Sequence, residues 1–267
     1  MNRQAPSAQA AGASPAAGAA PAVGKVPEVT LLFWVLKIVA TTLGETGGDA
    51  LSMSAGLGYL ASTGVYALLF ALAVALQVRA RAFHPPLYWA TIIATTTVGT
   101  TLADFADRSL GIGYAGGSLL LATLLAASLL AWWRALGSIA VGSVSGARAE
   151  VHYWTTIMCS QTLGTALGDW VADDGGFGFA GGTLLFASLL LAIVVAWRWT
   201  RVSRTALFWA AFVLSRPLGA TLGDLLDKPV VQGGLALSRY GASAVLLAFM
   251  VGCLLLLPQR AVQSIEN

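Results

Sequence analysis

Apolar residues fill most of this chain in eight stretches separated by short polar segments. A transmembrane helix needs about 20 mostly apolar residues, and the stretches cover roughly 30–47, 57–78, 87–105, 115–134, 152–171, 180–199, 207–225 and 240–257. The odd-numbered stretches are short and rich in glycine and threonine, whereas the even-numbered ones are longer runs of leucine, alanine and valine. The pattern predicts an all-α integral membrane protein with eight transmembrane helices.

Four copies of one two-helix unit make up the chain. Each copy opens with an aromatic pair that ends in a tryptophan: Trp34, Trp89, Trp154 and Trp209. A glycine follows ten residues later, at Gly44, Gly99, Gly164 and Gly219. An aspartate follows fifteen residues after the tryptophan, at Asp49, Asp104, Asp169 and Asp224. The predicted repeats cover 28–81, 82–148, 149–204 and 205–258.

Two spans per copy mean that every copy crosses the membrane in the same direction. The copies are therefore expected to be parallel repeats, pseudo-symmetric about the membrane normal, with equivalent residues at one depth. Fifteen residues of helix place each aspartate roughly 22 Å from its tryptophan. With the aromatic pairs in an interfacial belt, the aspartates lie near the outer helix ends. The repeated glycine lies near mid-span, where it lets another helix or a substrate approach closely.

Lysine and arginine residues are distributed unevenly between the two sets of loops. One set, with the flanking tails, contains Arg3, Lys25, Arg79, Arg81, Arg134, Arg148, Arg198, Arg201, Arg204 and Arg260. The opposite set contains Arg108, Lys228 and Arg239. Because positive charge favours the cytoplasmic side, both termini are predicted to be cytoplasmic.

Composition agrees with a membrane setting and narrows the partners. The chain is 57% hydrophobic and 10% charged, whereas soluble domains carry about 25% charged residues. The basic residues are spread over many loops, so no nucleic-acid partner is expected, and the surrounding partner is the lipid bilayer. Residues 1–27 are dominated by alanine, proline, glycine and serine and are predicted to be disordered. Residues 259–267 form a short C-terminal tail.

The repeat resembles that of a known family. The four glycine-to-aspartate segments read "GETGGD", "GTTLADF", "GTALGDW" and "GATLGDL". With the preceding tryptophans, over roughly 31–257, they resemble a bacterial family of multi-pass membrane-anchored proteins built from a tandem repeat of unknown function. The resemblance implies a bacterial inner-membrane location and supplies no substrate.

Carboxylates inside the spans are the main candidates for an ion-binding site. Ionisable groups within a bilayer are costly and usually mark a pathway or a binding site. Glu45 lies four residues before Asp49, on the same helix face, and such a pair binds a cation or shares a proton. The candidate cation or metal ligands are Glu45, Asp49, Asp104, Asp169 and Asp224. The alternatives are headgroup water around the aspartates and a salt bridge from Glu45 to another span.

Two basic residues and a glutamine complete the candidate ion- or substrate-binding set. Lys37 and Arg216 lie well inside spans, each eight residues before a carboxylate. Eight residues are ~12 Å along a helix, so their partners must come from other spans or be an anion. Gln161 belongs to an oxygen-rich lining, with many threonines and serines, that suits a hydrated cation or a small polar solute. Such side chains also join helices without binding a ligand.

Other polar residues are weaker candidates. Cys159 and Cys253 lie in apolar runs and have no metal-ligand spacing. His84 and His152 precede spans and are expected at the interface rather than in a site. The acids of the opposite loops either concentrate cations at a mouth or are simply solvated: Asp107, Asp173, Asp174 and Asp227.

The sequence therefore predicts a transport protein for a small cation, either a divalent metal or one coupled to protons. The alternative is a membrane scaffold or accessory subunit in which polar residues only specify helix packing. No nucleophile–histidine pairing or phosphate loop is present, so an enzyme is not expected, and no cofactor is predicted. The oligomeric state stays open.

Overall fold

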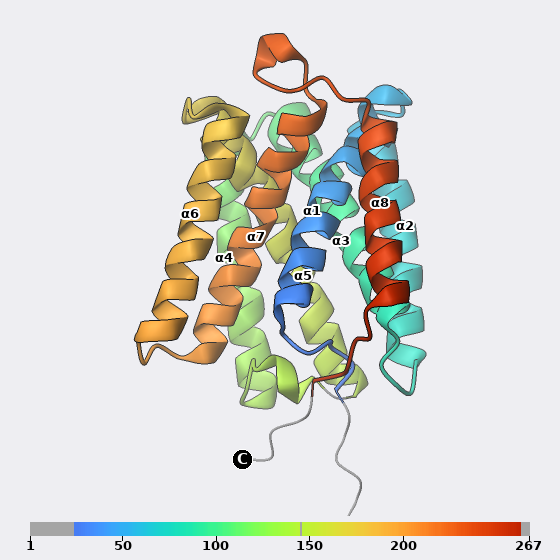
Figure 1. Cartoon of the computed structure of the whole chain (residues 1–267), viewed down its shortest axis with the longest axis vertical. Helices are drawn as coiled ribbons and strands as arrows, with labels where there is room; N and C mark the ends of the chain where they lie inside the picture. The colour runs from blue at the N-terminus through green and yellow to red at the C-terminus, as the bar shows by residue number, and fades with distance from the viewer. Residues whose placement is uncertain (1–23, 145, 263–267) are drawn as a thin grey trace, which may run out of the picture.

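The computed structural model describes residues 24–144 and 146–262, so most of the expected disordered tail, residues 1–23, lies outside the described residues. The described chain contains eight long α-helices (Figure 1). They are α1 (Leu31–Asp49), α2 (Gly58–Arg79), α3 (Pro85–Asp104), α4 (Tyr114–Leu136), α5 (Ala147–Asp169), α6 (Gly178–Trp199), α7 (Arg204–Asp227) and α8 (Arg239–Leu256). Two 3₁₀ turns, η3 (Val141–Ser143) and η5 (Val230–Gln232), lie in connections.

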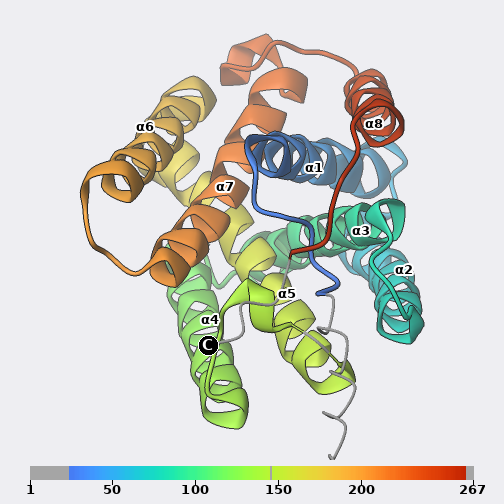
Figure 2. The ribbon, with the colours of Figure 1, turned by 60° about the horizontal axis from the view of Figure 1, so that its bottom comes forward.

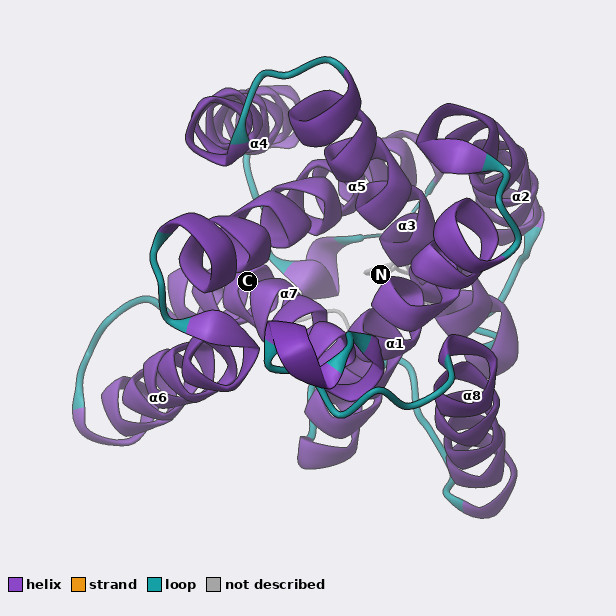
Figure 3. Cartoon of the chain, turned by 90° about the horizontal axis from the view of Figure 1, so that it is seen from above, coloured by secondary structure: helices purple, strands orange, loops and turns teal. Residues whose placement is uncertain are grey.

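The helices form an inner ring of four and an outer set of four, as the end-on view shows (Figure 3). The first helices of the repeats make the inner ring, in which α1 contacts α3, α3 contacts α5, α5 contacts α7, and α7 contacts α1. Each outer helix packs mainly on the inner helix of the next copy: α2 on α3, α4 on α5 and α6 on α7. Helix α8 packs on α1 and closes the cycle.

Polar residues are inside this assembly and apolar residues are outside. The inner helices bury threonine, serine, lysine, arginine and acidic side chains, whereas the outer helices expose long rows of leucine and valine. Among the described residues, five helices are long and apolar enough to cross a membrane: α2, α4, α6, α7 and α8. Helices α1, α3 and α5 are less apolar because their polar side chains face the interior of the ring.

The repeated mid-span glycine lets each inner helix touch the next. A Cβ on Gly44 would overlap the side chain of Thr96, one on Gly164 would overlap Arg216, and one on Gly219 would overlap Thr41. At Gly99 a Cβ would lie 3.0 Å from the backbone of Gln161. Each contacted residue lies seven positions after the tryptophan of the following copy, so the same contact is made four times around the ring.

The three inner helices α1, α3 and α5 widen directly after their last residue, the repeat aspartate. π-helical turns follow there as η1 (Ala50–Ser54), η2 (Phe105–Ser109) and η4 (Trp170–Asp174). Such turns are rare and often occur at functional sites. Helix α7 instead continues as an α-helix past Asp224 to Asp227, so the fourth copy shapes this end of the ring differently.

Aromatic side chains close the other end of the ring. Trp89, Trp154 and Trp209 are buried, and Tyr88 and Tyr153 share a 2.6 Å hydrogen bond between their hydroxyl groups. These repeat aromatics therefore face the interior of the ring and not its outer surface. They pack against one another in the interior, where neighbouring copies supply the apolar surface that they bury.

The two ends of the described chain meet beneath this aromatic end (Figure 2). Pro27 forms a β-bridge with Ala261, and the backbone N–H of Val262 donates to the carbonyl of Val26. Lys25 pairs with Glu150 of α5 at 2.5 Å. Residues 24–27 are therefore packed, not disordered as the sequence predicts, because Val26 is buried in the core and bonded to Val262 near the other end of the chain.

Candidate functional site

A stripe of residues at four-residue intervals runs along the inner face of each inner helix. Residues four apart share one face of an α-helix. Counting from the tryptophan, positions 3, 7, 11, 15 and 19 of the four copies form five successive layers along the ring, which we name by their content.

The first of the five layers lies nearest the aromatic end of the ring and the last lies at its mouth. The lysine layer contains Lys37, Ile92, Ile157 and Phe212. The arginine layer contains Thr41, Thr96, Gln161 and Arg216. The glutamate layer contains Glu45, Thr100, Thr165 and Ala220. The aspartate layer contains Asp49, Asp104, Asp169 and Asp224. The mouth layer contains Met53, Arg108, Asp173 and Lys228. Every residue of the first four layers is buried.

The four repeat aspartates are joined in two pairs by two basic residues of the mouth layer. Arg108 lies 3.2 Å from Asp104 of its own copy and 3.1 Å from Asp169 of the next copy. Lys228 lies 3.1 Å from Asp224 of its own copy and 2.5 Å from Asp49 of the first. Both bases thus connect adjacent helices of the ring, and the second connection closes the chain's last copy on its first.

This pairing reduces the four-fold arrangement to an approximate two-fold one. Copies two and four carry an acid three residues after the repeat aspartate and a base four residues after it, as in Asp107–Arg108 and Asp227–Lys228. Copies one and three lack the base and carry Met53 and Asp173 there instead. Every copy without a base therefore receives one from the copy before it.

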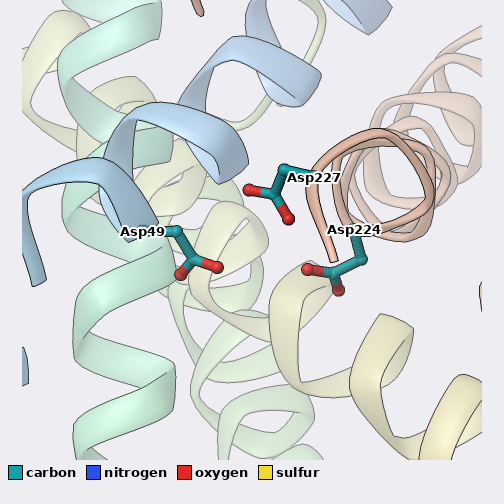
Figure 4. A group of neighbouring side chains, drawn as sticks. All are labelled: Asp49, Asp224 and Asp227. Atoms are coloured by element: carbon teal, nitrogen blue, oxygen red, sulfur yellow. The ribbon is translucent and has the colours of Figure 1, made fainter. Parts of the chain in front are cut away.

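Asp227 adds a fifth carboxylate beside the pair formed by Asp49 and Asp224. Oxygens of Asp49, Asp224 and Asp227 lie within 4.8 Å of one another, and their side chains converge between α1 and α7 (Figure 4). Arg239, at the start of α8, contacts Asp227 at 3.1 Å and Asp49 at 3.7 Å. One oxygen of Asp49 and one of Asp227 have no hydrogen-bond partner among the described residues, whereas Oδ1 of Asp224 lies 3.1 Å from Nζ of Lys228. The group offers the hard oxygen ligands that small cations prefer, and the Lys228 ammonium contacts two of them.

The side chain of Arg216 extends from the arginine layer into the glutamate layer, where its guanidinium group crosses the ring. Its Nη2 contacts Glu45 at 2.9 Å and donates to the hydroxyls of Thr100 and Thr165 at 2.6 Å each. These three residues are the glutamate-layer positions of the three other copies. The fourth copy carries Ala220 there, so Arg216 contacts every oxygen-bearing side chain of that layer.

Lys37 lies deeper, near the aromatic end. Its Nζ is 3.4 Å from Oε1 of Gln161 and 4.1 Å from the ring centre of Phe212. No carboxylate of the described residues lies within salt-bridge distance of it. Its exposed fraction is 0%, so this ammonium group is buried without a counter-ion.

A cavity of about 650 Å³ opens above the aspartate layer. All four residues of the mouth layer line it, so it lies over the ring. Tyr114 and Arg239 also line it, and the Tyr114 hydroxyl donates to Asp173 at 3.1 Å. The cavity lies at the end opposite the aromatic cluster, and two of its lining residues, Lys228 and Arg239, contact the buried carboxylates of Asp49, Asp224 and Asp227.

Charges at the mouth perturb one another. Burial alone would lower the pKa of Lys228, but the carboxylates of Asp224 and Asp49 raise it above its ordinary value. Burial raises the pKa of Asp107 to about 6, although the neighbouring Arg108 lowers it. Asp107 faces Gly117 of α4, and neither of its carboxylate oxygens has a hydrogen-bond partner among the described residues.

The structure places the predicted residues in three groups. Asp49 and Asp224 meet in one group, Asp104 and Asp169 meet in a second, and Glu45 forms the salt bridge that was the alternative for it. The partner of Glu45 is Arg216, so that base is balanced internally, whereas Lys37 is not. Gln161 contacts Lys37. Asp173 and Asp174 are exposed, but Asp107 and Asp227 are buried and not solvated loop acids.

Three basic residues of the site were not recognised as site residues from the sequence: Arg108, Lys228 and Arg239. The sequence pattern predicts them only as loop charges that set the orientation in the membrane. The signal for the first two was present, because each follows a repeat aspartate by four residues and such neighbours share a helix face. Arg239 has no such signal, since it reaches Asp227 only through the folding of the α7–α8 connection.

Comparison with protein families identifies the repeat. The family model described as a repeat of unknown function, DUF347, matches residues 32–83, 87–137, 152–203 and 207–258. A comparison with curated proteins gives no match, and a comparison with solved structures gives none. The four matches span most of the chain and coincide with the four tryptophan-to-aspartate units. The chain therefore belongs to the DUF347 repeat family and carries four tandem copies of its repeat.

Proposed function

We propose that this protein is a multi-pass membrane transport protein that moves a small cation, either a divalent metal or a proton-coupled ion, through the ring of inner helices. The observation that carries the proposal is the buried acidic cluster at the base of an open cavity. The ion would enter by the cavity, exchange with Lys228 at Asp49, Asp224 and Asp227, and pass the glutamate layer when Arg216 releases Glu45.

The charge of the cluster favours a positively charged ligand. Its carboxylates are Asp49, Asp104, Asp169, Asp224 and Asp227, and its bases are Arg108, Lys228 and Arg239. The carboxylates outnumber the bases by two (five against three). Buried like charges cannot all ionise cheaply, so a bound cation or protons must compensate for this excess.

The membrane arrangement follows from the distribution of polar and apolar surface. We infer that all eight helices cross the bilayer, since α1, α3 and α5 are enclosed by the apolar outer helices and run parallel to α7. The axis of the ring then coincides with the membrane normal. The excess of lysine and arginine at the aromatic end favours cytoplasmic termini, in the bacterial inner membrane, with the cavity on the opposite side.

A scaffold role remains the second candidate, and one observation favours it. Arg108, Lys228 and Arg216 each connect side chains of different copies, which is also how polar groups hold membrane helices together. A scaffold needs these contacts for assembly but has no use for an acidic excess beneath an open cavity. The two functions therefore predict different effects of aspartate-to-asparagine variants: loss of ion flux for a transporter, and loss of folding or assembly for a scaffold.

The test is a flux measurement on the purified full-length protein in lipid vesicles. Vesicles that contain a pH- or metal-sensitive dye are given proton, magnesium or manganese gradients. We expect flux with the unmodified protein and at least a tenfold loss in Asp49→Asn/Asp224→Asn. The matched control is Asp174→Asn, since Asp174 is exposed at the same end. Size-exclusion chromatography and the melting temperature show whether each variant is folded.

Two outcomes would reject transport. The first is a lack of flux of all tested cations by the unmodified, folded protein. The second is unchanged flux in the folded double variant. Loss of folding or of a co-purifying partner in that variant, without any flux by the unmodified protein, would instead support the scaffold.

A further inference from the structure

The inner layers of the ring carry an excess of the opposite charge to that of the aspartate cluster. Lys37 and Arg216 are both fully buried, with exposed fractions of 0%. Glu45 is the one carboxylate in contact with either of them among the described residues, and it pairs with Arg216. Two bases therefore face one acid here. An uncompensated buried charge costs several kcal/mol, so this excess calls for a ligand or for loss of a proton.

Hydrogen-bond donors in the same layers lack acceptors. Nε and Nη1 of Arg216 and Nε2 of Gln161 are buried and have no partner among the described residues. Lys37 has three protons to donate and one oxygen at 3.4 Å, Oε1 of Gln161. Because that oxygen accepts from Lys37, the amide nitrogen of Gln161 is directed elsewhere. Buried donors without acceptors are rare and costly in native proteins.

These donors come from three of the four inner helices: Lys37 contacts Gln161, and the helix that carries Arg216, α7, packs against both α1 and α5. Lys37 lies on α1, Gln161 on α5 and Arg216 on α7. The lysine and arginine layers are one helical turn apart, about 6 Å along the axis. The aromatic ring of Phe212 attracts the Lys37 ammonium group electrostatically. The ring does not replace an oxygen or an anion as a hydrogen-bond acceptor.

We propose that Lys37, Gln161 and Arg216 form a buried binding site for a small monovalent anion of the halide class. One negative charge balances the excess of one positive charge in these layers, and a halide accepts several N–H donors at once without directional demands. This site shares Arg216 with the path proposed for the cation, but it lies two layers away from the acidic cluster at which the cation is proposed to bind. It gives Lys37 the counter-ion that no carboxylate of the described residues supplies.

The test compares chloride with gluconate on the full-length protein in detergent. The melting temperature is measured at equal ionic strength as chloride replaces gluconate. Ligand that binds only the folded state stabilises it by RT ln(1 + [L]/Kd), so we expect a rise that follows a single binding curve. Lys37→Met is expected to abolish this chloride-dependent rise, and Gln161→Leu is expected to weaken binding about tenfold. Arg134→Met, which removes an exposed base, should behave like the unmodified protein.

Three results would overturn the proposal. One is an equal melting temperature in chloride and gluconate for the unmodified protein. Another is a full chloride response in Lys37→Met. If that variant does not fold, a full response in Gln161→Leu is the third. The measurement requires no transport, and Asp49→Asn/Asp224→Asn should keep the chloride response, so failure of the anion site and failure of cation transport are distinguishable.

Discussion

Both bases of the mouth layer, Arg108 and the buried Lys228, are shared between two copies of the repeat. Lys228 contacts Asp224 on its own helix and Asp49 across the junction of the last and first copies. A charge of this kind is costly to bury but more costly to leave without its partner. The change in the free energy of unfolding when Lys228 is removed therefore measures how much it stabilises the two buried carboxylates.

Replacement of Lys228 by methionine should destabilise the protein. The change leaves Asp49 and Asp224 close together with Arg239 as the remaining nearby base, and breaking a buried pair typically costs about 3–5 kcal/mol. Denaturant unfolding in detergent measures the loss. Lys228→Met/Asp49→Asn should recover part of the stability, because it removes one of the unpaired charges. If the double variant is less stable than Lys228→Met, the assigned pairing is wrong.

The pKa of Asp107 predicts a dependence of stability on pH. Its folded-state pKa of about 6 is above the ordinary value of 3.8, so the folded protein binds this proton more tightly than the unfolded chain does. Its contribution to the unfolding free energy must therefore fall as pH rises from about 4 through 6. Asp107→Asn should melt higher than the unmodified protein at pH 8 and lose that advantage at pH 4.

Asp174→Asn is the control for this comparison, since Asp174 is exposed near the equivalent end of another copy. Its melting temperature should follow that of the unmodified protein at both pH values. An Asp107→Asn variant whose advantage is the same at pH 4 and pH 8 would show that the effect does not come from ionisation of Asp107.

The repeat register predicts the intramembrane acids but not how they are paired. The repeat register places Asp49, Asp104, Asp169 and Asp224 at equivalent positions, and the four-residue spacing could also have identified Arg108 and Lys228. The partner of Glu45 could not be predicted, because that pair joins α1 to α7. Residues 171 positions apart meet only once the order of helices around the ring is known.

At the scale of helices, the mid-span glycines explain why the inner ring is narrow. Each glycine admits a side chain of the next copy, and the contact recurs at all four junctions. Close approach of this kind is the usual basis of helix association in membranes, where apolar burial between helices gives no driving force. The glycine is therefore required by packing, and its recurrence does not by itself indicate a substrate path.

Alanine at these glycines should destabilise the ring. Gly219→Ala places a methyl group on Thr41, and overpacking of this kind typically costs about 1–3 kcal/mol. Gly64→Ala on α2 is the matched control, since nothing lies within 4 Å of its added Cβ. It should be neutral or stabilise by up to about 1 kcal/mol, because alanine favours helix more than glycine. Equal effects of the two changes on the free energy of unfolding would contradict the assigned packing.

The sequence predicts the helices better than their termini and surroundings. All eight apolar stretches correspond to helices of the structure. The π-helical turns after Asp49, Asp104 and Asp169 have no recognisable sequence signal, because they depend on how each helix meets its neighbours. The aromatic pairs were assigned to an interface for a similar reason: the residue types fit a membrane boundary, and their burial depends on the neighbouring copies.

Taken as a whole, the molecule is a closed cycle in which covalent and packing units do not coincide. The repeat in the sequence joins α1 to α2, but α2 packs on α3 of the next copy, and α8 packs on α1. The terminal segments also pair with each other beside the aromatic end. The chain could therefore begin at another connection of the cycle without the loss of any contact between helices.

A circular permutant tests this closure. A short linker joins Val262 to Gly24, and the new termini open the α2–α3 connection at Arg81, on the same side as the original termini. We expect a folded, monodisperse protein with nearly the original melting temperature, because all helix contacts are retained. Opening within α3 between Gly99 and Thr100 is the control and should abolish folding. A permutant opened at Arg81 that aggregates would indicate that the junction of α8 with α1 is not equivalent to the others.

The alternation of copies with and without a base has a consequence for assembly. Copies one and two together form half of the ring, and copies three and four form the other half. Each half has one mouth-layer position without a base (Met53 or Asp173) and one with a base (Arg108 or Lys228). A shorter chain with just two such copies would contain one mouth-layer base and two repeat aspartates, but it would leave two helix faces uncovered. It would build the same eight-helix cycle by pairing with a second molecule about a two-fold axis, which is the arrangement expected if the present chain arose by fusion of two such halves.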